Sequence, residues 1–325
     1  EQPTLVQLLE PSTTGIGHGA SLAIDGDSAV VGTPNPGGYG VADVYRRQWL
    51  PEDQWSVESL PWYWEWVCRL KPVDEQLDSR FGQSVAISGD TVVVGAWKDD
   101  RFGFNAGGAW VFQIPTSPSG TLLSSETLTP SARQPGDYFG WSAVASEGLF
   151  AIGGWGADVD GQDAAGSVWV FERSGSAMVQ RARLSGGSHA APNARFGSSL
   201  DMTSTVLAVG APSTPGGGGV HLFEHQGDGV ALADYIPNPE GDSGDAFGAS
   251  LSIAGSDLFE GIVVGAPGDG ELGPLAGTIW LFEGPDEGVV EVDGGYKQFA
   301  SDGGPWHQTG SSVVVMMHEL GGGTN

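Results

Sequence analysis

A Phe-Gly pair returns at nearly regular intervals along this 325-residue chain, and it constrains the fold more than any other feature. The pairs are Phe81-Gly82, Phe139-Gly140, Phe196-Gly197 and Phe247-Gly248, whose glycines lie 58, 57 and 51 residues apart. His18-Gly19 and Thr309-Gly310 extend the series at its two ends. Each of the six glycines is followed two residues later by serine, at Ser21, Ser84, Ser142, Ser199, Ser250 and Ser312. A sequence period of this size indicates a repeat architecture.

Four short apolar segments follow one another inside each complete unit. The second segment ends at a glycine that lies 13 residues after the first glycine in four units and 17 in the fifth: Gly32, Gly95, Gly153, Gly210 and Gly265. The segments are rich in β-branched and aromatic residues and are bounded by Gly, Asp and Pro, as strands are. Four antiparallel strands in each of several repeats are typical of a β-propeller. We therefore expect an all-β chain with five complete blades and a partial sixth, in a six- or seven-bladed ring.

The repeat also predicts the domain organisation, which is a single β-propeller domain over residues 1–325. The predicted blades cover residues 17–70, 80–128, 138–184, 195–236 and 246–299, with a partial blade at 306–325. The fourth strands are expected at Trp66–Leu70, Leu122–Leu128, Val179–Leu184, Leu232–Ile236 and Tyr296–Phe299. The N-terminal strand, residues 4–9, is expected to complete the last blade beside an inner strand at Ser311–Met317. Two of its middle strands are then still missing, so we expect an incomplete or irregular chain, with a last blade built by a partner as the alternative.

The Phe-Gly pair together with Gly210-Ala211-Pro212 and Gly265-Ala266-Pro267 resembles the FG-GAP repeat family, to which the head propellers of integrin α-subunits belong. The resemblance extends over about residues 4–315. It implies a β-propeller that acts in extracellular recognition or cell adhesion. Integrin-like repeats often carry an Asp-x-Asp-x-Asp-Gly calcium loop between the first two strands. This chain has only short turns there, such as Asp25-Gly26-Asp27 and Ser88-Gly89-Asp90, so those calcium sites are not carried over.

One other segment resembles half of a calcium-binding loop. Asp158, Asp160 and Asp163 are spaced with Gly161 among them, but the distal bidentate Glu of such loops is missing. A solvated acidic turn is the stronger interpretation. Calcium at these three carboxylates is the alternative, and it is the single cofactor that the sequence suggests.

The charge of the chain excludes several classes of partner. Thirteen basic residues against 40 acidic ones give a formal net charge of −27, which disfavours nucleic acid and anionic membrane surfaces. No apolar run is long enough to span a membrane. The acidic composition favours a secreted, extracellular or organelle-lumen location. The single Cys68 allows no disulfide within the chain.

The long loops of such a propeller lie on one rim, which makes that rim the predicted binding face. They are the segments 73–80, 97–107, 155–166, 238–246 and 268–277. On this rim Trp97, Trp155, Asp99 and Asp100 are candidate partner-binding residues. Keeping the protein soluble is the alternative role for the acidic loops.

Tryptophans also crowd the first blade, around an insertion at residues 46–61. Trp49, Trp55 and Trp62 are candidates for docking a partner, whereas packing between blades is favoured for Trp64 and Trp66. The alternation of Trp62, Trp64, Trp66, Cys68 and Leu70 predicts that these side chains share one strand face.

No acid–base constellation recurs in the repeats, so an enzyme is not expected. Gly241-Asp242-Ser243-Gly244 resembles the nucleophile motif of serine proteases, but no suitable His motif accompanies it. His221 and His225 match the spacing of a zinc-protease motif that requires a helix, whereas on a strand they lie about 13 Å apart at ~3.3 Å per residue. The leading hypothesis is a non-catalytic protein-interaction or adhesion propeller, acting alone or as an accessory subunit of a larger assembly. A carbohydrate-binding propeller is the alternative, and a hydrolase or lyase is less favoured.

Overall fold

The computed structural model describes residues 7–9, 16–51, 61–226, 229–255, 261–270, 276–283, 297–299 and 308–312. These residues form β-sheets and one 3-10 turn at Gly187–His189, and they contain no helix long and apolar enough to cross a membrane. The chain divides into two compact units, unit 1 over Glu1–Ser185 and unit 2 over Gly186–Asn325.

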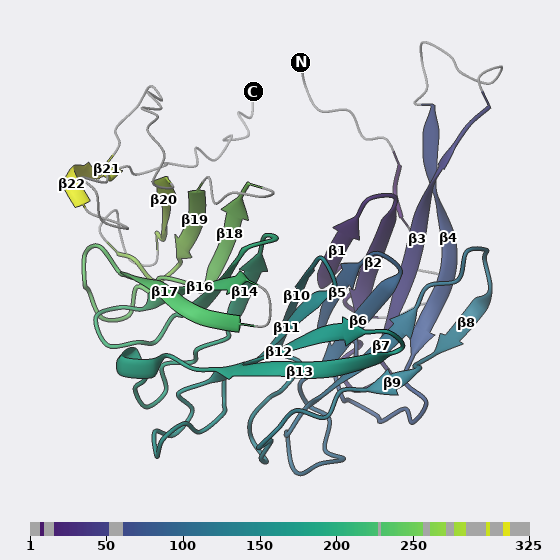
Figure 1. Cartoon of the computed structure of the whole chain (residues 1–325), viewed down its shortest axis with the longest axis horizontal. Helices are drawn as coiled ribbons and strands as arrows, with labels where there is room; N and C mark the ends of the chain where they lie inside the picture. Colours follow the sequence, from purple (N-terminus) through teal and green to yellow (C-terminus); the bar gives the residue numbers. More distant parts are fainter. Residues whose placement is uncertain are drawn as a thin grey trace, which may run out of the picture. The chain divides into compact units, whose positions relative to one another are not determined.

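Unit 1 contains three sheets, shown in Figure 1. Sheet I consists of β1 (Ser21–Asp25), β2 (Ser28–Thr33), β3 (Val41–Trp49), β4 (Trp62–Lys71) and β8 (Gly120–Leu123). Sheet II consists of β5 (Ser84–Ser88), β6 (Thr91–Ala96), β7 (Gly108–Gln113) and β9 (Glu126–Thr127). Sheet III consists of β10 (Ser142–Ser146), β11 (Leu149–Gly154), β12 (Ser167–Ser174) and β13 (Ala177–Leu184).

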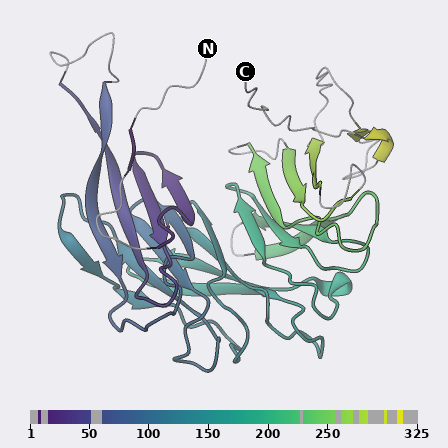
Figure 2. The same ribbon diagram turned by 180° about the vertical axis from the view of Figure 1, so that it is seen from behind.

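Unit 2 contains the remaining sheets, which Figure 2 shows from behind. Sheet IV consists of β14 (Ser199–Met202), β15 (Val206–Ala211), β16 (Gly219–Gln226) and β17 (Gly229–Pro237). Sheet V consists of β18 (Ser250–Ala254), β19 (Gly261–Ala266) and β20 (Thr278–Glu283). A separate pair is formed by β21 (Lys297–Phe299) and β22 (Gln308–Ser312).

The middle strands read as continuous apolar runs because neighbouring sheets cover both of their faces. In β6, Val92 and Val94 belong to the core shared with sheet I, whereas Val93 between them belongs to the core shared with sheet III. A third core in unit 2 joins sheets IV and V through residues such as Leu222 and Trp280. Strands buried on both faces lose the apolar–polar alternation of a half-exposed sheet. The four-stranded antiparallel sheets and their face-to-face packing define a β-propeller fold.

The recurring Gly-x-Ser motif connects one sheet to the next. The Ser84 hydroxyl in sheet II donates to the carbonyl oxygen of Gly140 in sheet III at 2.9 Å. Ser21 and Ser199 make the same bond to the next Phe-Gly glycine, at 2.9 and 2.7 Å. Gly95 lies beneath this bond, and a Cβ there would be 2.2 Å from Ser84 Oγ and 2.3 Å from Gly140 O. The spacing of the motifs therefore reflects a close backbone contact that only glycine allows.

The phenylalanine of each pair fills the core beside the third strand of its own sheet. Phe81, Phe139, Phe196 and Phe247 are each at most 1% exposed. The phenylalanine ring contacts Trp110 in sheet II at 5.6 Å and Trp169 in sheet III at 5.3 Å between ring centroids. Sheet I departs from this scheme because His18 replaces the phenylalanine. Its third strand has Asp43 at the equivalent position, fully buried and hydrogen-bonded to both Arg69 and the indole of Trp66.

Two expectations about individual strands are wrong, and a third fails over the residues that the structure describes. Leu122–Leu128 does not form one outer strand, because β8 pairs in parallel with β4 of sheet I and only β9 pairs with β7. Of the expected strand at Tyr296–Phe299, the described residues 297–299 form β21, which pairs with β22 rather than with β20. Near the N-terminus, residues 7–9 form no strand, and the Gln7 side chain exchanges two hydrogen bonds with the Trp64 backbone. Residues 4–6 and 313–317 lie outside the described residues.

Candidate functional site

Four aromatic side chains gather at the end of sheets II and III. Trp97 follows β6, Trp155 follows β11, and Tyr138 and Trp141 flank the Phe-Gly pair that leads into β10. Tyr138 stacks on Trp155 at 4.4 Å and meets Trp97 at 5.4 Å, and Trp141 contacts Trp97 at 5.5 Å and Trp155 at 5.7 Å between ring centroids. All four side chains are half-buried. We call these four residues the rim cluster.

The local backbone holds the Tyr138 ring in the rim cluster. Tyr138 has a φ of +56°, in the left-handed region that non-glycine residues rarely adopt. Its backbone N–H donates to the carbonyl oxygen of Asn105 in the loop after β6, at 3.1 Å. Gly156 lies under the ring, since a Cβ there would be 2.4 Å from Tyr138 Cδ2. The equivalent residues Arg80, Arg195 and Ala246 share this left-handed conformation, whereas the packing of the Tyr138 ring on the Gly156 backbone belongs to this joint.

The sequence placed Trp97 and Trp155 on the binding rim, and the structure brings them together. Sequence reasoning missed Tyr138 and Trp141, which complete the cluster. A signal was present in the sequence, because only the Phe139-Gly140 pair has an aromatic residue on both sides, Tyr138 and Trp141. The equivalent residues elsewhere are Arg80 and Gln83, Arg195 and Ser198, and Ala246 and Ala249.

The Asp99 side chain does not lie on the rim surface. It is 1% exposed, and its carboxylate accepts hydrogen bonds from Nε and from a terminal guanidinium nitrogen of Arg101 at 3.0 Å. The carboxylate therefore organises the loop after β6 from within. Asp100 is exposed, but its Oδ1 accepts the backbone N–H of Asn105 at 2.7 Å. The sequence could not separate the two neighbours, because burial is decided by the path of the loop.

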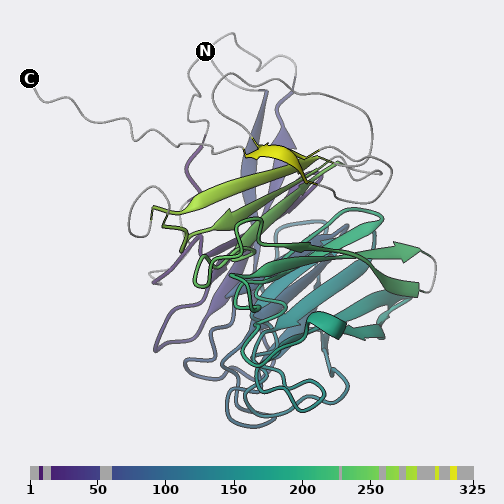
Figure 3. The same ribbon diagram turned by 90° about the vertical axis from the view of Figure 1, so that its left-hand side faces the viewer.

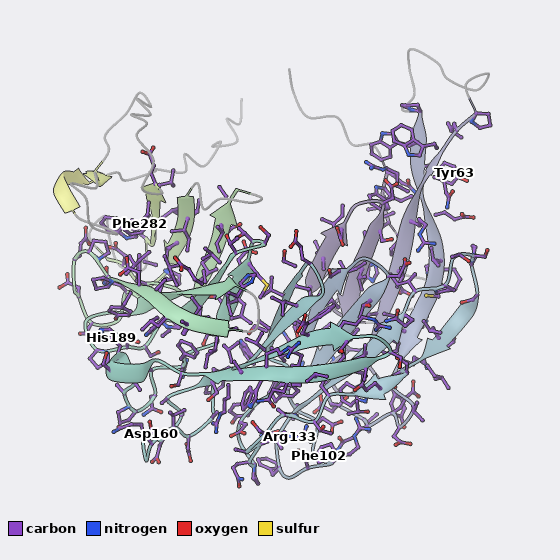
Figure 4. The ribbon with its side chains drawn as sticks, viewed as in Figure 1. Tyr63, Phe102, Arg133, Asp160, His189 and Phe282 are labelled. Atoms are coloured by element: carbon purple, nitrogen blue, oxygen red, sulfur yellow. The ribbon has the colours of Figure 1, made fainter. Side chains whose placement is uncertain are left out.

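Two charged side chains, the half-buried Arg133 and the buried Asp137, lie in the same region. Figure 4 shows Phe102 and Arg133 close together, at the same end of unit 1 as Asp160. The Arg133 guanidinium lies 3.5 Å from the Phe102 ring centroid, and burial lowers its pKa to about 10. Asp137 is 2% exposed, and burial raises the pKa of its carboxyl group to about 6.

The three candidate calcium ligands are exposed and occupy a tight turn. Asp158 Oδ1 accepts the backbone N–H of Ala164 at 2.8 Å, and Val159 and Gln162 exchange backbone hydrogen bonds around Asp160. Among the residues that the structure describes, no three His, Cys, Asp or Glu side chains are grouped to hold a metal ion. In this conformation Asp158, Asp160 and Asp163 therefore do not form such a ligand set.

A second aromatic surface lies at the tip of the β3–β4 hairpin. Trp49 pairs with Trp62 across the two strands, and the Arg47 guanidinium carbon lies 5.4 and 5.6 Å from their ring centroids. Trp49 is 57% exposed and Tyr63 is 42% exposed. Figures 1 and 3 show both strands running on past β1 and β2. We call Arg47, Trp49, Trp62 and Tyr63 the hairpin tip. Trp55 lies outside the described residues.

The predicted single aromatic face of β4 is wrong because of a β-bulge. Trp66 pairs with Tyr45 and Cys68 pairs with Val44, so the register shifts at Val67. Successive residues of β3 face opposite sides, which puts Trp66 and Cys68 on opposite faces. Trp66 hydrogen-bonds the buried Asp43, whereas Cys68 lies in the core between sheets I and II. Burial raises the pKa of the Cys68 thiol to about 12.

Unit 2 contains a buried histidine where sheets II, III and V have tryptophan. His221 is fully buried on β16, in contact with the rings of Phe196, Tyr235 and His189 at 5.0, 4.7 and 5.7 Å. Burial, with a smaller effect of the neighbouring His189, lowers the pKa of His221 to about 4. The imidazole is therefore neutral at physiological pH.

Comparison with known proteins agrees with this architecture. The fold is that of the β-propeller class, and residues 64–112, from β4 through β7, match the model of the FG-GAP repeat. The chain thus contains an FG-GAP repeat. The matched region includes β4 of sheet I and the first three strands of sheet II, β5 to β7. No curated protein sequence matches the chain.

Several solved structures are similar at low sequence identity. The WD40 domain of Toxoplasma gondii coronin is 13% identical with a TM-score of 0.46, covering 81% of this chain and 55% of that one. The Pseudomonas aeruginosa periplasmic gluconolactonase PpgL is 14% identical with a TM-score of 0.47, covering 88% and 76%. Kluyveromyces lactis Hsv2p is 9% identical with a TM-score of 0.40, covering 80% and 57%. The chain therefore spans a little over half the length of the coronin and Hsv2p chains.

Proposed function

We propose that this chain is a non-catalytic binding protein that docks a protein partner through the hairpin tip, as a member of a larger assembly. The observation that carries the proposal is the exposed Trp49, with the half-buried Trp62 opposite it and the Arg47 guanidinium in contact with both rings. Tryptophan and arginine are the residues most enriched among those that dominate binding energy at protein interfaces. An extracellular or luminal location, suggested by the acidic composition, belongs to the same proposal.

The hairpin tip is ordered before any partner arrives. The Nε of Arg47 donates to Asp27 Oδ1 at 2.7 Å, and its guanidinium contacts both indole rings. Strand pairing continues to the tip, where the Leu50 N–H donates to Pro61 O at 2.7 Å. A side chain already held in one position loses less entropy on binding, which favours affinity. The equivalent hairpin of sheet III is shorter: Arg173 corresponds to Arg47, and the chain already turns between Ser174 and Ala177, so this hairpin has no counterpart of the Trp49–Trp62 pair.

The experiment compares the native size of the full chain with that of two variants. Tagged chains are expressed in the source cells, extracts are fractionated by size under mild conditions, and the chain is quantified by mass spectrometry. The wild type is expected in fractions well above its own mass of 33.6 kDa. The double variant Trp49→Gln, Trp62→Gln is expected to move to the monomer position, since losing interface aromatics commonly costs 2 kcal/mol or more, roughly 30-fold in affinity.

Trp141→Gln is the matched control, because it also removes a half-exposed indole but lies in the rim cluster. It is expected to co-migrate with the wild type. A wild-type chain that migrates as a monomer refutes the proposal. So does a double variant that stays in the assembly.

A further inference from the structure

We propose that the rim cluster is a binding site for the ring of a neutral sugar, separate from the hairpin tip. Trp97, Tyr138, Trp141 and Trp155 present aromatic surface at the junction of sheets II and III. The site is independent of the proposed function, because it uses other residues and takes another class of ligand.

The repeats themselves show that the fold does not require these aromatic residues. The position of Trp97 and Trp155 is proline in the other units, at Pro34, Pro212 and Pro267. Trp141 is replaced by Ala20, Gln83, Ser198 and Ala249. These other units form their strands and their joints without an aromatic residue at these positions. Three indoles and a phenol gather, only half-buried, at one joint, and we infer that they serve a function other than folding.

Three basic side chains near the rim cluster, Lys98, Arg80 and Arg101, are paired with carboxylates within the chain. Lys98 and Arg80 both form ion pairs with Asp78, and the hydrogen bond from Lys98 lowers the pKa of that carboxyl group. Arg101 is paired with the buried Asp99. An ionic ligand would have to displace one of these pairs, whereas a neutral ligand would not. The neighbouring loop adds further apolar surface, since Phe102 and Phe104 are 48% and 73% exposed.

A sugar ring fits aromatic surface bordered by polar groups. One face of a pyranose carries C–H bonds with a partial positive charge, which match the electron-rich face of an indole. Its hydroxyl groups point outward around the ring, where they remain hydrated or meet polar side chains. The mutual contacts of the four rings restrict their rotamers, as does the Gly156 backbone under Tyr138. Less entropy is then lost on binding.

The test is native affinity electrophoresis of the full chain in gels that contain one soluble polysaccharide each. The neutral probes are mixed-linkage β-glucan, xyloglucan, arabinoxylan and galactomannan. Heparin and tetramethylammonium chloride are the anionic and cationic comparisons. At least one neutral polysaccharide is expected to retard the wild type, and neither charged probe is expected to bind or compete.

Two variants locate the binding. Trp141→Gln gives the joint the residue that sheet II has at position 83, and Trp97→Pro gives it the Gly-Ala-Pro sequence found at 210–212. Each is expected to weaken binding about tenfold, the loss that corresponds to one good aromatic contact. The thermal unfolding of both variants is measured alongside. The binding result is taken from the variant whose unfolding midpoint is closer to that of the wild type. Trp49→Gln, in the hairpin tip, is the control and is expected to bind as the wild type does.

The proposal is overturned if no neutral polysaccharide in the set retards the wild type, or if both rim variants bind undiminished. Retardation that tetramethylammonium abolishes would instead identify a cation site and also overturn it. These outcomes leave the hairpin proposal untouched, because that proposal is tested by native size.

Discussion

Acidification is expected to destabilise unit 2 through His221, and the variant His221→Phe should remove the effect. The folded pKa of about 4 lies below the ordinary value of 6.5. The unfolded chain therefore binds a proton at a pH where the folded chain does not. The unfolding free energy accordingly falls as the pH drops from about 7 towards 4, and the stability that the neutral imidazole supports is lost over that window.

The size of the effect follows from the pKa difference. A depression of 2.5 units, at about 1.36 kcal/mol per unit, gives roughly 3 kcal/mol between neutral pH and pH values below 4. Between pH 7 and pH 5 the same linkage gives about 2 kcal/mol. A phenylalanine at position 221 does not titrate and keeps an aromatic ring against Phe196 and Tyr235. The variant should thus lack this part of the pH dependence.

Native-state hydrogen exchange read by mass spectrometry confines the measurement to unit 2. The protection of amides in β15 and β16, corrected for the intrinsic pH dependence of exchange, is compared at pH 7 and pH 5. For the wild type, the protection should fall by the equivalent of about 2 kcal/mol between pH 7 and pH 5. For His221→Phe it should change much less. The control is Trp280→Phe, at the equivalent position of sheet V, which should lower protection equally at both pH values. An equal pH dependence in wild type and His221→Phe would refute the argument.

Three further changes test the packing. Asp137→Asn should stabilise unit 1 at pH 7 by up to about 3 kcal/mol, because burial raises the carboxyl pKa from 3.8 to about 6. This gain in stability should largely disappear near pH 4, where the carboxyl group is mostly protonated. Urea unfolding at the two pH values measures the difference. Gly95→Ala should lower the unfolding free energy by more than about 3 kcal/mol, since its Cβ would lie 2.3 Å from Gly140 O. Ser84→Ala removes one hydrogen bond and should lower it by only about 1 kcal/mol. Equal unfolding midpoints for the two variants would contradict the close contact. Leu22→Ala should lower the unfolding free energy by under about 0.5 kcal/mol, since Leu22 on β1 is 71% exposed. Val85→Ala, at the equivalent buried position of β5, should lower it by about 2 kcal/mol. If thermal unfolding shows equal losses for the two variants, β1 is covered in solution.

Local contacts explain what could be predicted and what could not. The two-residue turns at Gly26-Asp27 and Gly89-Asp90 follow from their residues, because both glycines adopt positive φ between paired strands. The exchange of β8 into sheet I depends on the outer edge of β4, which is remote from β8 in the sequence. The bulge at Val67 has no such local signal, and it reversed the predicted facing of Cys68.

The sequence by itself determined the repeat, most of the strands and the all-β class, because the Phe-Gly-x-Ser motif recurs with a fixed spacing that reflects the close glycine contact seen at Gly32, Gly95 and Gly210. It also pointed to Trp97, Trp155, Trp49 and Trp62 as unusual. Only the tertiary structure decided how such residues combine, by bringing Tyr138 and Trp141 to Trp97 and Trp155 and by placing Arg47 in contact with two indoles. Burial likewise separated Asp99 from Asp100. Side-chain neighbours that come from different sheets are set by packing, and packing is not encoded in any one stretch of residues.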